Sequence, residues 1–232
     1  MKKTIVFISL FICYTMMVSA QKKQVLTIWF ENRFGKERLI PEQTFYLNGT
    51  DTLVINRFKY YVSHIQLTNT AGKTIVPENQ YYLIDIADEK STSVQITVPE
   101  GSYTGIQFLL GVDSSRNVSG VQTGALDPLN GMFWTWNSGY IMAKMEGTAS
   151  SSMIAGKQFT YHIGGFRQHQ QTARNIRLQT TPFHTSVTIV ADAEKWLEGI
   201  SIAKEPVCHS PGTLAVRIAD NYSKMFSISV KE

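Results

Sequence analysis

The chain has 232 residues, of which 43% are hydrophobic and 17% charged. The formal net charge is only +4 and the charged residues are scattered, which argues against a surface built to bind nucleic acid or an anionic membrane. The sequence contains no internal repeat, low-complexity tract or linker, so we expect one domain with a sizeable core.

The first 20 residues have the pattern of a secretory signal peptide. Lys2 and Lys3 precede an apolar run, and Ser19 and Ala20 form the small-residue end that a signal peptidase accepts. A single-span anchor is the alternative, but the run falls short of the roughly 20 apolar residues that a span needs. We therefore expect cleavage before Gln21, a periplasmic or secreted protein of the bacterial envelope, and no membrane span after cleavage.

We expect different roles for the two cysteines. Cys13 lies within the signal peptide and lacks the small preceding residue of a lipid-modification site. Cys208 is then the one cysteine of the mature chain, residues 21–232, so an internal disulfide is excluded. A buried apolar role for Cys208 is the simpler expectation, although an unpaired thiol beside His209 is also a potential metal-binding pair.

Ten segments rich in β-branched and aromatic residues predict strands, bounded by Asn, Asp, Gly or Pro. They are residues 25–30, 52–55, 59–67, 81–86, 93–98, 105–110, 140–146, 157–163, 175–179 and 184–191. Residues 194–199 predict a helical turn, and residues 213–226 a short helix. The spacing is typical of an all-β fold, which we expect to be an antiparallel β-sandwich with long ordered loops and a short C-terminal helix.

The segment from Gly111 to Gly147 is the densest in special residues. Its glycines interrupt any long helix or strand, so most of it should be an ordered loop, and such loops often carry function. Within it, the order Gly-x-Leu-Asp-Pro-x-x-Gly-Met-x-Trp-x-Trp is followed by Gly-Tyr and then Lys-x-Glu-Gly. This order resembles the MbnP family of periplasmic proteins associated with copper, and weaker echoes occur at residues 60–63, 82–85 and 161–165.

The resemblance implies a β-sandwich and a copper site. In some members of the family the gene lies beside that of a di-haem protein of the MbnH type, which oxidises a tryptophan to kynurenine, and the modified side chain takes part in copper binding. The resemblance thus implies an MbnH-type partner for this chain as well. Trp134 and Trp136 are the candidates for modification, because they lie two apart in the loop and would share a face in an extended backbone. The alternative is a packed aromatic cluster or a binding surface.

The five histidines are the natural ligands for copper, because neutral imidazole suits it. His162 is the first candidate, since its strand end resembles the family's His-x-Gly motif; a buried histidine bonded to a carbonyl is the alternative. His64 is the second: alternation puts Tyr60, Val62 and His64 on one face of a strand, where many relatives carry Asn. It is either a gained ligand or a polar group. His169 lies in a polar turn and should be solvated.

Two further sets of side chains offer metal donors. Met132 is the better thioether candidate for Cu(I), whereas Met142 and Met145 should fill gaps in a core. Asp113, Asn117, Asp127 and Asn130 could together hold a structural Ca²⁺, but the alternating spacing of a calcium loop is missing and we favour turns made by these side chains.

No catalytic motif of the nucleophile-elbow, zinc-protease or P-loop kind is present, so no enzyme activity is expected. The leading hypothesis is a secreted, non-enzymatic copper-binding protein for copper acquisition or homeostasis, with His162, His64 and Met132 as candidate ligands. The alternative is an envelope interaction module that binds a protein or glycan through its aromatic loop, without a transition metal.

Overall fold

The computed structural model describes residues 22–136 and 139–229. The expected signal peptide, residues 1–20, lies outside this range, as does Gln21. None of the helices in the described ranges is both long enough and apolar enough to cross a membrane.

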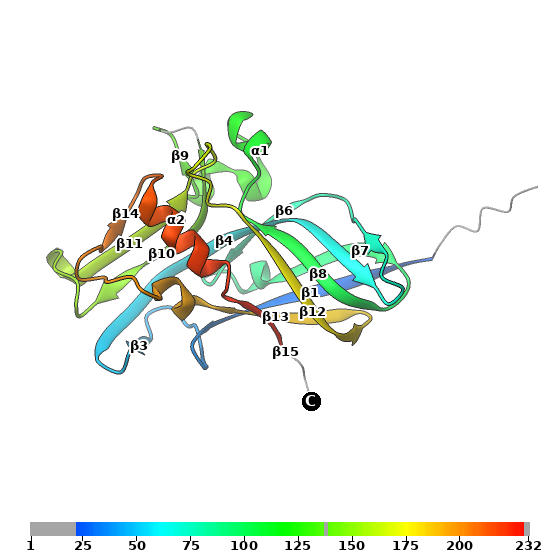
Figure 1. The fold of residues 1–232 in the computed structure, drawn as a ribbon, viewed down its shortest axis with the longest axis horizontal. Helices are drawn as coiled ribbons and strands as arrows, with labels where there is room; N and C mark the ends of the chain where they lie inside the picture. The colour runs from blue at the N-terminus through cyan, green and yellow to red at the C-terminus, as the bar shows by residue number, and fades with distance from the viewer. Residues whose placement is uncertain (1–21, 137–138, 230–232) are drawn as a thin grey trace, which may run out of the picture.

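Two sheets pack face to face, so the predicted β-sandwich is confirmed (Figure 1). The first sheet contains β1 (Lys23–Phe34), β2 (Glu37–Arg38), β7 (Ser93–Pro99), β13 (Ser186–Asp192) and β15 (Phe226–Ser229). The second contains β3 (Thr44–Leu47), β4 (Asp51–Asn69), β5 (Thr74–Ile75), β6 (Tyr81–Asp85), β8 (Tyr103–Leu110), β9 (Phe133–Trp134), β10 (Gly139–Ala149), β11 (Gln158–Gly164), β12 (Arg174–Phe183) and β14 (Val207–Cys208).

The helical elements are short and connect the strands. They are η1 (Glu89–Thr92), α1 (Ser114–Val118), η2 (Gly124–Leu126), η3 (Pro128–Asn130), η4 (Ala155–Lys157), η5 (Ala193–Leu197) and α2 (Thr213–Tyr222). The predicted C-terminal helix is present but ends at Tyr222, four residues earlier than expected, because the chain turns through Ser223 to Met225 and enters β15 at Phe226.

Three other expectations about the strands need correction. Residues 52–55 and 59–67 belong to one long strand, β4. The sheets are not wholly antiparallel, because β1 pairs in parallel with β13, and β11 with β14. His64 does not share a face with Tyr60 and Val62: it has φ of 52°, and the register with β8 shifts between Ser63 and Gln66. This bulge turns His64 outward and brings Ile65 into the core.

The main core lies between the two sheets, and a second core lies under the loop. Tyr60 and Tyr61 are both fully buried, but Tyr60 belongs to the main core whereas Tyr61 points to the opposite face of β4. There it packs with Val112, Leu126, Met132, Trp134, Tyr140, Ile141 and Met142, which we call the loop core. The 111–134 segment is therefore an ordered cap on the outer face of the second sheet, and α1 and β9 gather at one end of the molecule (Figure 1).

Candidate functional site

His162 lies on the outer face of β11, because its neighbours Tyr161 and Ile163 are both buried in the main core. Its Nε2 atom is 2.6 Å from Oε1 of Glu146, which lies on the adjacent strand β10. The Lys-x-Glu-Gly motif thus supplies the carboxylate that holds this histidine. Glu146 was not among the residues that sequence reasoning selected for the site.

His209 is the second imidazole of this region, and its ring stacks on that of His162 at a centroid distance of 4.5 Å and an interplanar angle of 27°. The pairing follows from β14, which runs parallel to β11 with Cys208 opposite Tyr161, so the next residue lies beside His162. Cys208 itself is buried, and burial raises the pKa of its thiol to about 11, which disfavours the thiolate that binds metals.

Charged side chains surround the carboxylate of Glu146. Arg57 Nη1 lies 2.7 Å from Oε2, and Lys144 Nζ lies 3.5 Å from Oε1. The hydrogen bond from His162, together with these two cations, outweighs burial and lowers the pKa of Glu146 to about 2. We call His162, His209, Glu146, Lys144 and Arg57 the His162 cluster.

The ionised carboxylate of Glu146 determines which nitrogen of His162 carries a proton. Because Glu146 can only accept at neutral pH, Nε2 of His162 carries the proton of this bond, and in the neutral ring Nδ1 keeps its lone pair. A carboxylate that holds the second nitrogen in this way is the usual partner of a metal-binding histidine. Burial, and next the neighbouring His162, lowers the pKa of His209 and so favours its neutral, ligand-competent form.

Trp134 lies against the strand that carries His162. A Cβ atom built on Gly164 would come within 2.6 Å of the indole carbon Cζ3 of Trp134, so the ring rests directly on the glycine. Gly164 and His162 are two residues apart on β11 and share its outer face. The indole therefore lies on the same surface as His162.

The two loop tryptophans contact each other but differ in exposure. Their ring centroids are 5.4 Å apart, and Trp134 is 6% exposed whereas Trp136 is 64% exposed. The strand β9 ends at Trp134, and Trp136 lies in the turn that follows. The two indoles nevertheless lie against each other, and only Trp134 belongs to the loop core.

The three methionines considered in the sequence, Met132, Met142 and Met145, are buried in the two cores. Met132 is fully buried in the loop core, beside Met142, whose Sδ accepts a hydrogen bond from the Val112 N–H at 3.2 Å. Met145 lies in the main core. Lys144 Nζ donates to the carbonyl of Gly131 at 2.7 Å, which connects the His162 cluster to the residue before Met132.

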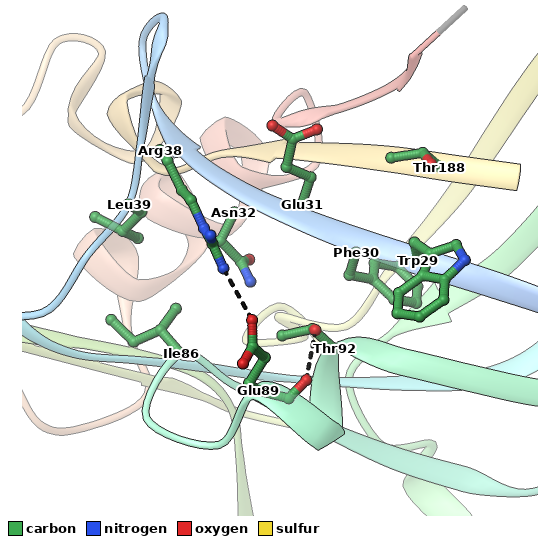
Figure 2. Close-up of a pocket in the computed structure, with 10 residues that line it drawn as sticks. All are labelled: Trp29, Phe30, Glu31, Asn32, Arg38, Leu39, Ile86, Glu89, Thr92 and Thr188. Atoms are coloured by element: carbon green, nitrogen blue, oxygen red, sulfur yellow. Dashed lines mark hydrogen bonds and ion pairs between the residues drawn. The ribbon is translucent and has the colours of Figure 1, made fainter. Parts of the chain in front are cut away.

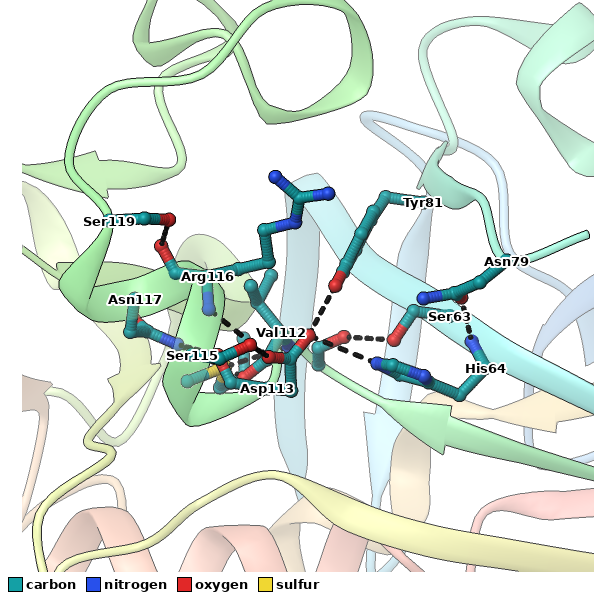
Figure 3. A network of polar contacts seen from close by, with 12 residues as sticks. Ser63, His64, Asn79, Tyr81, Val112, Asp113, Ser115, Arg116, Asn117 and Ser119 are labelled. Carbon is teal, nitrogen blue, oxygen red and sulfur yellow. Dashed lines mark hydrogen bonds and ion pairs between the residues drawn. The ribbon is translucent and has the colours of Figure 1, made fainter.

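His64 belongs to a different group of polar side chains. Its Nε2 is 3.0 Å from Oδ2 of Asp113, and the Tyr81 hydroxyl donates to the same oxygen, so that His64 and Tyr81 converge on Asp113 (Figure 3). The guanidinium of Arg116 lies over the Tyr81 ring, 5.7 Å from its centroid. We call these four residues the His64 cluster.

The carboxylate of Asp113 organises the His64 cluster. Burial by itself would raise its pKa, but hydrogen bonds from Ser115, Tyr81 and His64 outweigh burial and hold the pKa well below the ordinary value. Burial and the bond to Asp113 raise the pKa of Tyr81 to about 12. Asp113, ionised at neutral pH, thus anchors the start of α1 to β4 and β6.

The strand registers keep His64 and His162 apart. Lys59 of β4, Lys144 of β10 and His162 of β11 lie side by side, and His64 is five residues further along β4. With strands about 4.8 Å apart and a rise of about 3.3 Å per residue, the two histidines are more than about 15 Å apart. Two imidazoles at that distance do not bind one ion, so the three predicted ligands do not form a single site.

The four Asp and Asn residues considered for Ca²⁺ make turn hydrogen bonds. Asp113 caps α1 and Asp127 caps η3, each by accepting from a backbone N–H. Asn117 Nδ2 donates to the carbonyls of Val112 and Asp113, and Asn130 Nδ2 to those of Gly124 and Ala125. These bonds support the turn interpretation.

Across residues 22–136 and 139–229, no three or more His, Cys, Asp or Glu side chains are arranged to hold a metal ion. Among these residues, the stacked pair offers two imidazole nitrogens and no complete set of ligands. His184 bonds to Ser102 at 3.2 Å, and His169 lies in an exposed turn, so neither joins the pair.

Comparison with known proteins gives two results. The sequence model of the MbnP family matches residues 23–210. The fold is similar to that of MbnP from Methylosinus trichosporium, with a TM-score of 0.58 and 17% sequence identity over 84% of this chain and 87% of that chain. A search of curated proteins gave no match.

Proposed function

Because the chain belongs to the MbnP family, we propose that it is a non-enzymatic copper-binding protein of the bacterial periplasm that serves copper acquisition or homeostasis. The imidazoles of His162 and His209 are the copper ligands, and Trp134 lies against the same face of β11. The observation that carries the proposal is the stacked histidine pair, with Glu146 holding the first ring.

The side chains present fit copper in part. Imidazole nitrogens suit copper, but two of them are too few for a stable site, and an unmodified indole has only an N–H donor to offer. Oxidation of Trp134 to kynurenine, by a di-haem partner of the MbnH type, would supply a carbonyl and an aromatic amine beside His162. Copper binding then depends on the modification.

Of the three predicted copper ligands, only His162 is retained. His64 is held by Asp113 in the separate His64 cluster, and Met132 is packed in the loop core, so neither is assigned to copper. His209, which sequence reasoning set aside, takes their place. Calcium has no role in the proposal, because the Asp and Asn side chains of the loop already bind backbone groups.

A second candidate function rests on the exposed apolar residues of the cap. Val118, Val121, Leu129 and Trp136 are all more than half exposed; the first three lie within the cap, and Trp136 lies two residues beyond its end. Such residues favour a protein–protein contact. They suit docking of the modifying partner, and equally an interaction module that holds no metal.

Metal analysis separates the two functions. Protein purified from its native envelope, in cells that contain the di-haem partner, should carry about one copper ion per chain. The same folded protein, made without the partner, should bind copper more weakly. Copper-free native protein that also fails to bind added copper would contradict the copper proposal and leave the interaction module.

A further inference from the structure

A cavity of about 360 Å³ opens at the edge of the first sheet, and none of its lining residues belongs to the His162 or His64 cluster. Trp29 and Asn32 of β1 line it, together with Arg38, Glu89 and Thr188 (Figure 2). The copper proposal makes no use of these residues. The cavity volume lies at the lower end of the range of about 300–1,000 Å³ for small-molecule sites.

The cavity exists because β1 changes partner along one edge. β7 pairs with β1 only as far as Trp29, and β2 pairs with it only from Arg33 onward. In the described part of the chain, residues 30–32 therefore have no strand partner on this edge. The short helix η1 and the residue Leu39 border the gap that is left.

Asn32 contributes a side-chain amide to the lining of the cavity. Its side chain is buried, with the residue only 7% exposed, and its Oδ1 accepts from the Tyr60 hydroxyl at 3.0 Å. No described residue accepts from its Nδ2, which points into the cavity (Figure 2). Tyr60 occupies one of the two amide atoms, and the other is not among the fully buried unpaired atoms of the described residues, so it can donate to a molecule in the cavity.

The charges at the mouth are balanced. Arg38 lies 3.3 Å from Glu89 across the cavity, and Arg33 lies 2.8 Å from Glu31. These pairs offer donors and acceptors without an excess of either sign, which favours a neutral ligand over an anion or a cation. The indole of Trp29, 47% exposed, adds a flat apolar face.

We propose that this cavity binds a neutral sugar of one or two rings. A pyranose combines what the lining requires: hydroxyls that accept from the Asn32 amide and Arg38 and donate to Glu89, and a C–H face that packs on Trp29. The site is independent of copper, because it lies on the first sheet and the His162 cluster lies on the second.

The proposal is tested by titrating isotope-labelled mature protein with a panel of neutral hexoses, N-acetylhexosamines and their disaccharides, and by recording backbone NMR shifts. At least one sugar should shift residues 29–32, 38–39, 86–92 and 188. The Trp29→Ala variant should then bind it about 10-fold more weakly or worse. Titration with longer oligosaccharides of the same sugar then separates two sources of the ligand. Shifts of the same residues indicate the end of a glycan chain, and their absence indicates a free sugar.

The matched control is Tyr46→Ala, which removes another exposed aromatic ring that does not line the cavity and should leave sugar binding unchanged. Arg38→Ala gives a second exposed variant that does not disturb the Asn32–Tyr60 bond, and it should also weaken binding. The proposal is overturned if no sugar of the panel shifts these residues. Thermal unfolding checks that Trp29→Ala and the parent protein are both folded. If both are folded and bind the sugar equally well, the proposal is also overturned.

Discussion

His162 and His209 stack with their ring centroids 4.5 Å apart, although 46 residues separate them along the chain. The contact depends on the two-residue strand β14, which places the Cys208-His209 pair against β11. Glu146 holds His162 from the other side at 2.6 Å. The arrangement joins two imidazoles and a carboxylate from three separate stretches of sequence, and the first two predictions test its role.

Replacing His162 with Ala should weaken copper binding by about 10-fold or more without loss of the fold, because removing a ligand costs at least as much as removing its hydrogen-bond partner. His209→Ala should behave alike. Copper titration followed by spectroscopy measures both. The control is His169→Ala in an exposed turn, which should titrate like the parent; a folded His162→Ala variant with unchanged affinity would refute the assignment.

Glu146→Gln should lower copper affinity by about 10-fold, because the amide still bonds to His162 but no longer supplies the charge that makes its ring a better donor. Glu205→Gln is the matched control, since Glu205 is paired with Arg217 at 2.8 Å and lies outside the cluster. Equal copper affinities for the two variants would show that Glu146 only stabilises the strand pair.

Trp134 should be the modified tryptophan in protein made with the di-haem partner, because it lies against Gly164 on the face that carries His162. Peptide mass spectrometry on native protein locates the kynurenine. Trp134→Phe should abolish both the kynurenine and the tight copper binding, whereas Trp136→Phe should keep both. Kynurenine found at position 136 instead, or at neither position in a strain with the partner, would contradict this prediction.

Most of the strands of the fold could be predicted from the alternation of apolar and polar residues in the sequence. Alternation in residues 25–30 or 93–98 depends on one buried face, and each such segment became a strand in the sandwich. The parallel pairing of β1 with β13 could not be predicted, because alternation records which face is buried and not which strand lies alongside. The bulge at His64 could not be predicted either, because the residue types around His64 do not indicate that its φ is positive.

The candidate site was predicted less well than the fold. His162 and Trp134 were selected from the strand-end and loop motifs, and the indole of Trp134 lies against Gly164, on the face of β11 that carries His162. His209 was missed because its partner is distant in sequence and β14 is too short to predict. Glu146 was quoted within a motif but not considered as the partner of a histidine; a carboxylate two residues from Lys144 on an outward strand face was the available signal.

Asp113→Asn should destabilise the fold by about 1–3 kcal/mol at neutral pH, because three side chains bond to this carboxylate. The carboxyl pKa is lower in the folded state, so its contribution is present above the unfolded value of about 3.9 and is lost as pH falls through the folded value. The stability gap between the parent and Asp113→Asn should therefore shrink below about pH 4. Urea unfolding at several pH values measures it.

The control for this pH dependence is Asp220→Asn, since Asp220 is an exposed partner of Arg174 and should contribute little at any pH. A gap between Asp113→Asn and the parent that stays constant down to pH 2, or that widens on acidification, would contradict the role given to Asp113.

Gly147→Ala should destabilise the protein by about 3 kcal/mol, because the new Cβ would lie 1.9 Å from the carbonyl oxygen of Val54 and the strand pair β4–β10 would have to part. Gly105→Ala is the control: its Cβ meets mainly the movable end of the Gln179 side chain, so the cost should stay below about 1 kcal/mol. Thermal unfolding of both variants checks the prediction, and equal midpoints would contradict it.

The parallel contact between β1 and β13 also determines when the protein can fold. Lys23–Phe34 is the first described strand, and it pairs with Ser186–Asp192, which in turn pairs with Phe226–Ser229 at the far end of the described chain. The first sheet therefore cannot close until nearly all residues are available, and such long-range pairing makes folding slow. In a chain of this topology, the edge of β1 that pairs in parallel stays without its strand partner until residues 186–192 have been synthesised.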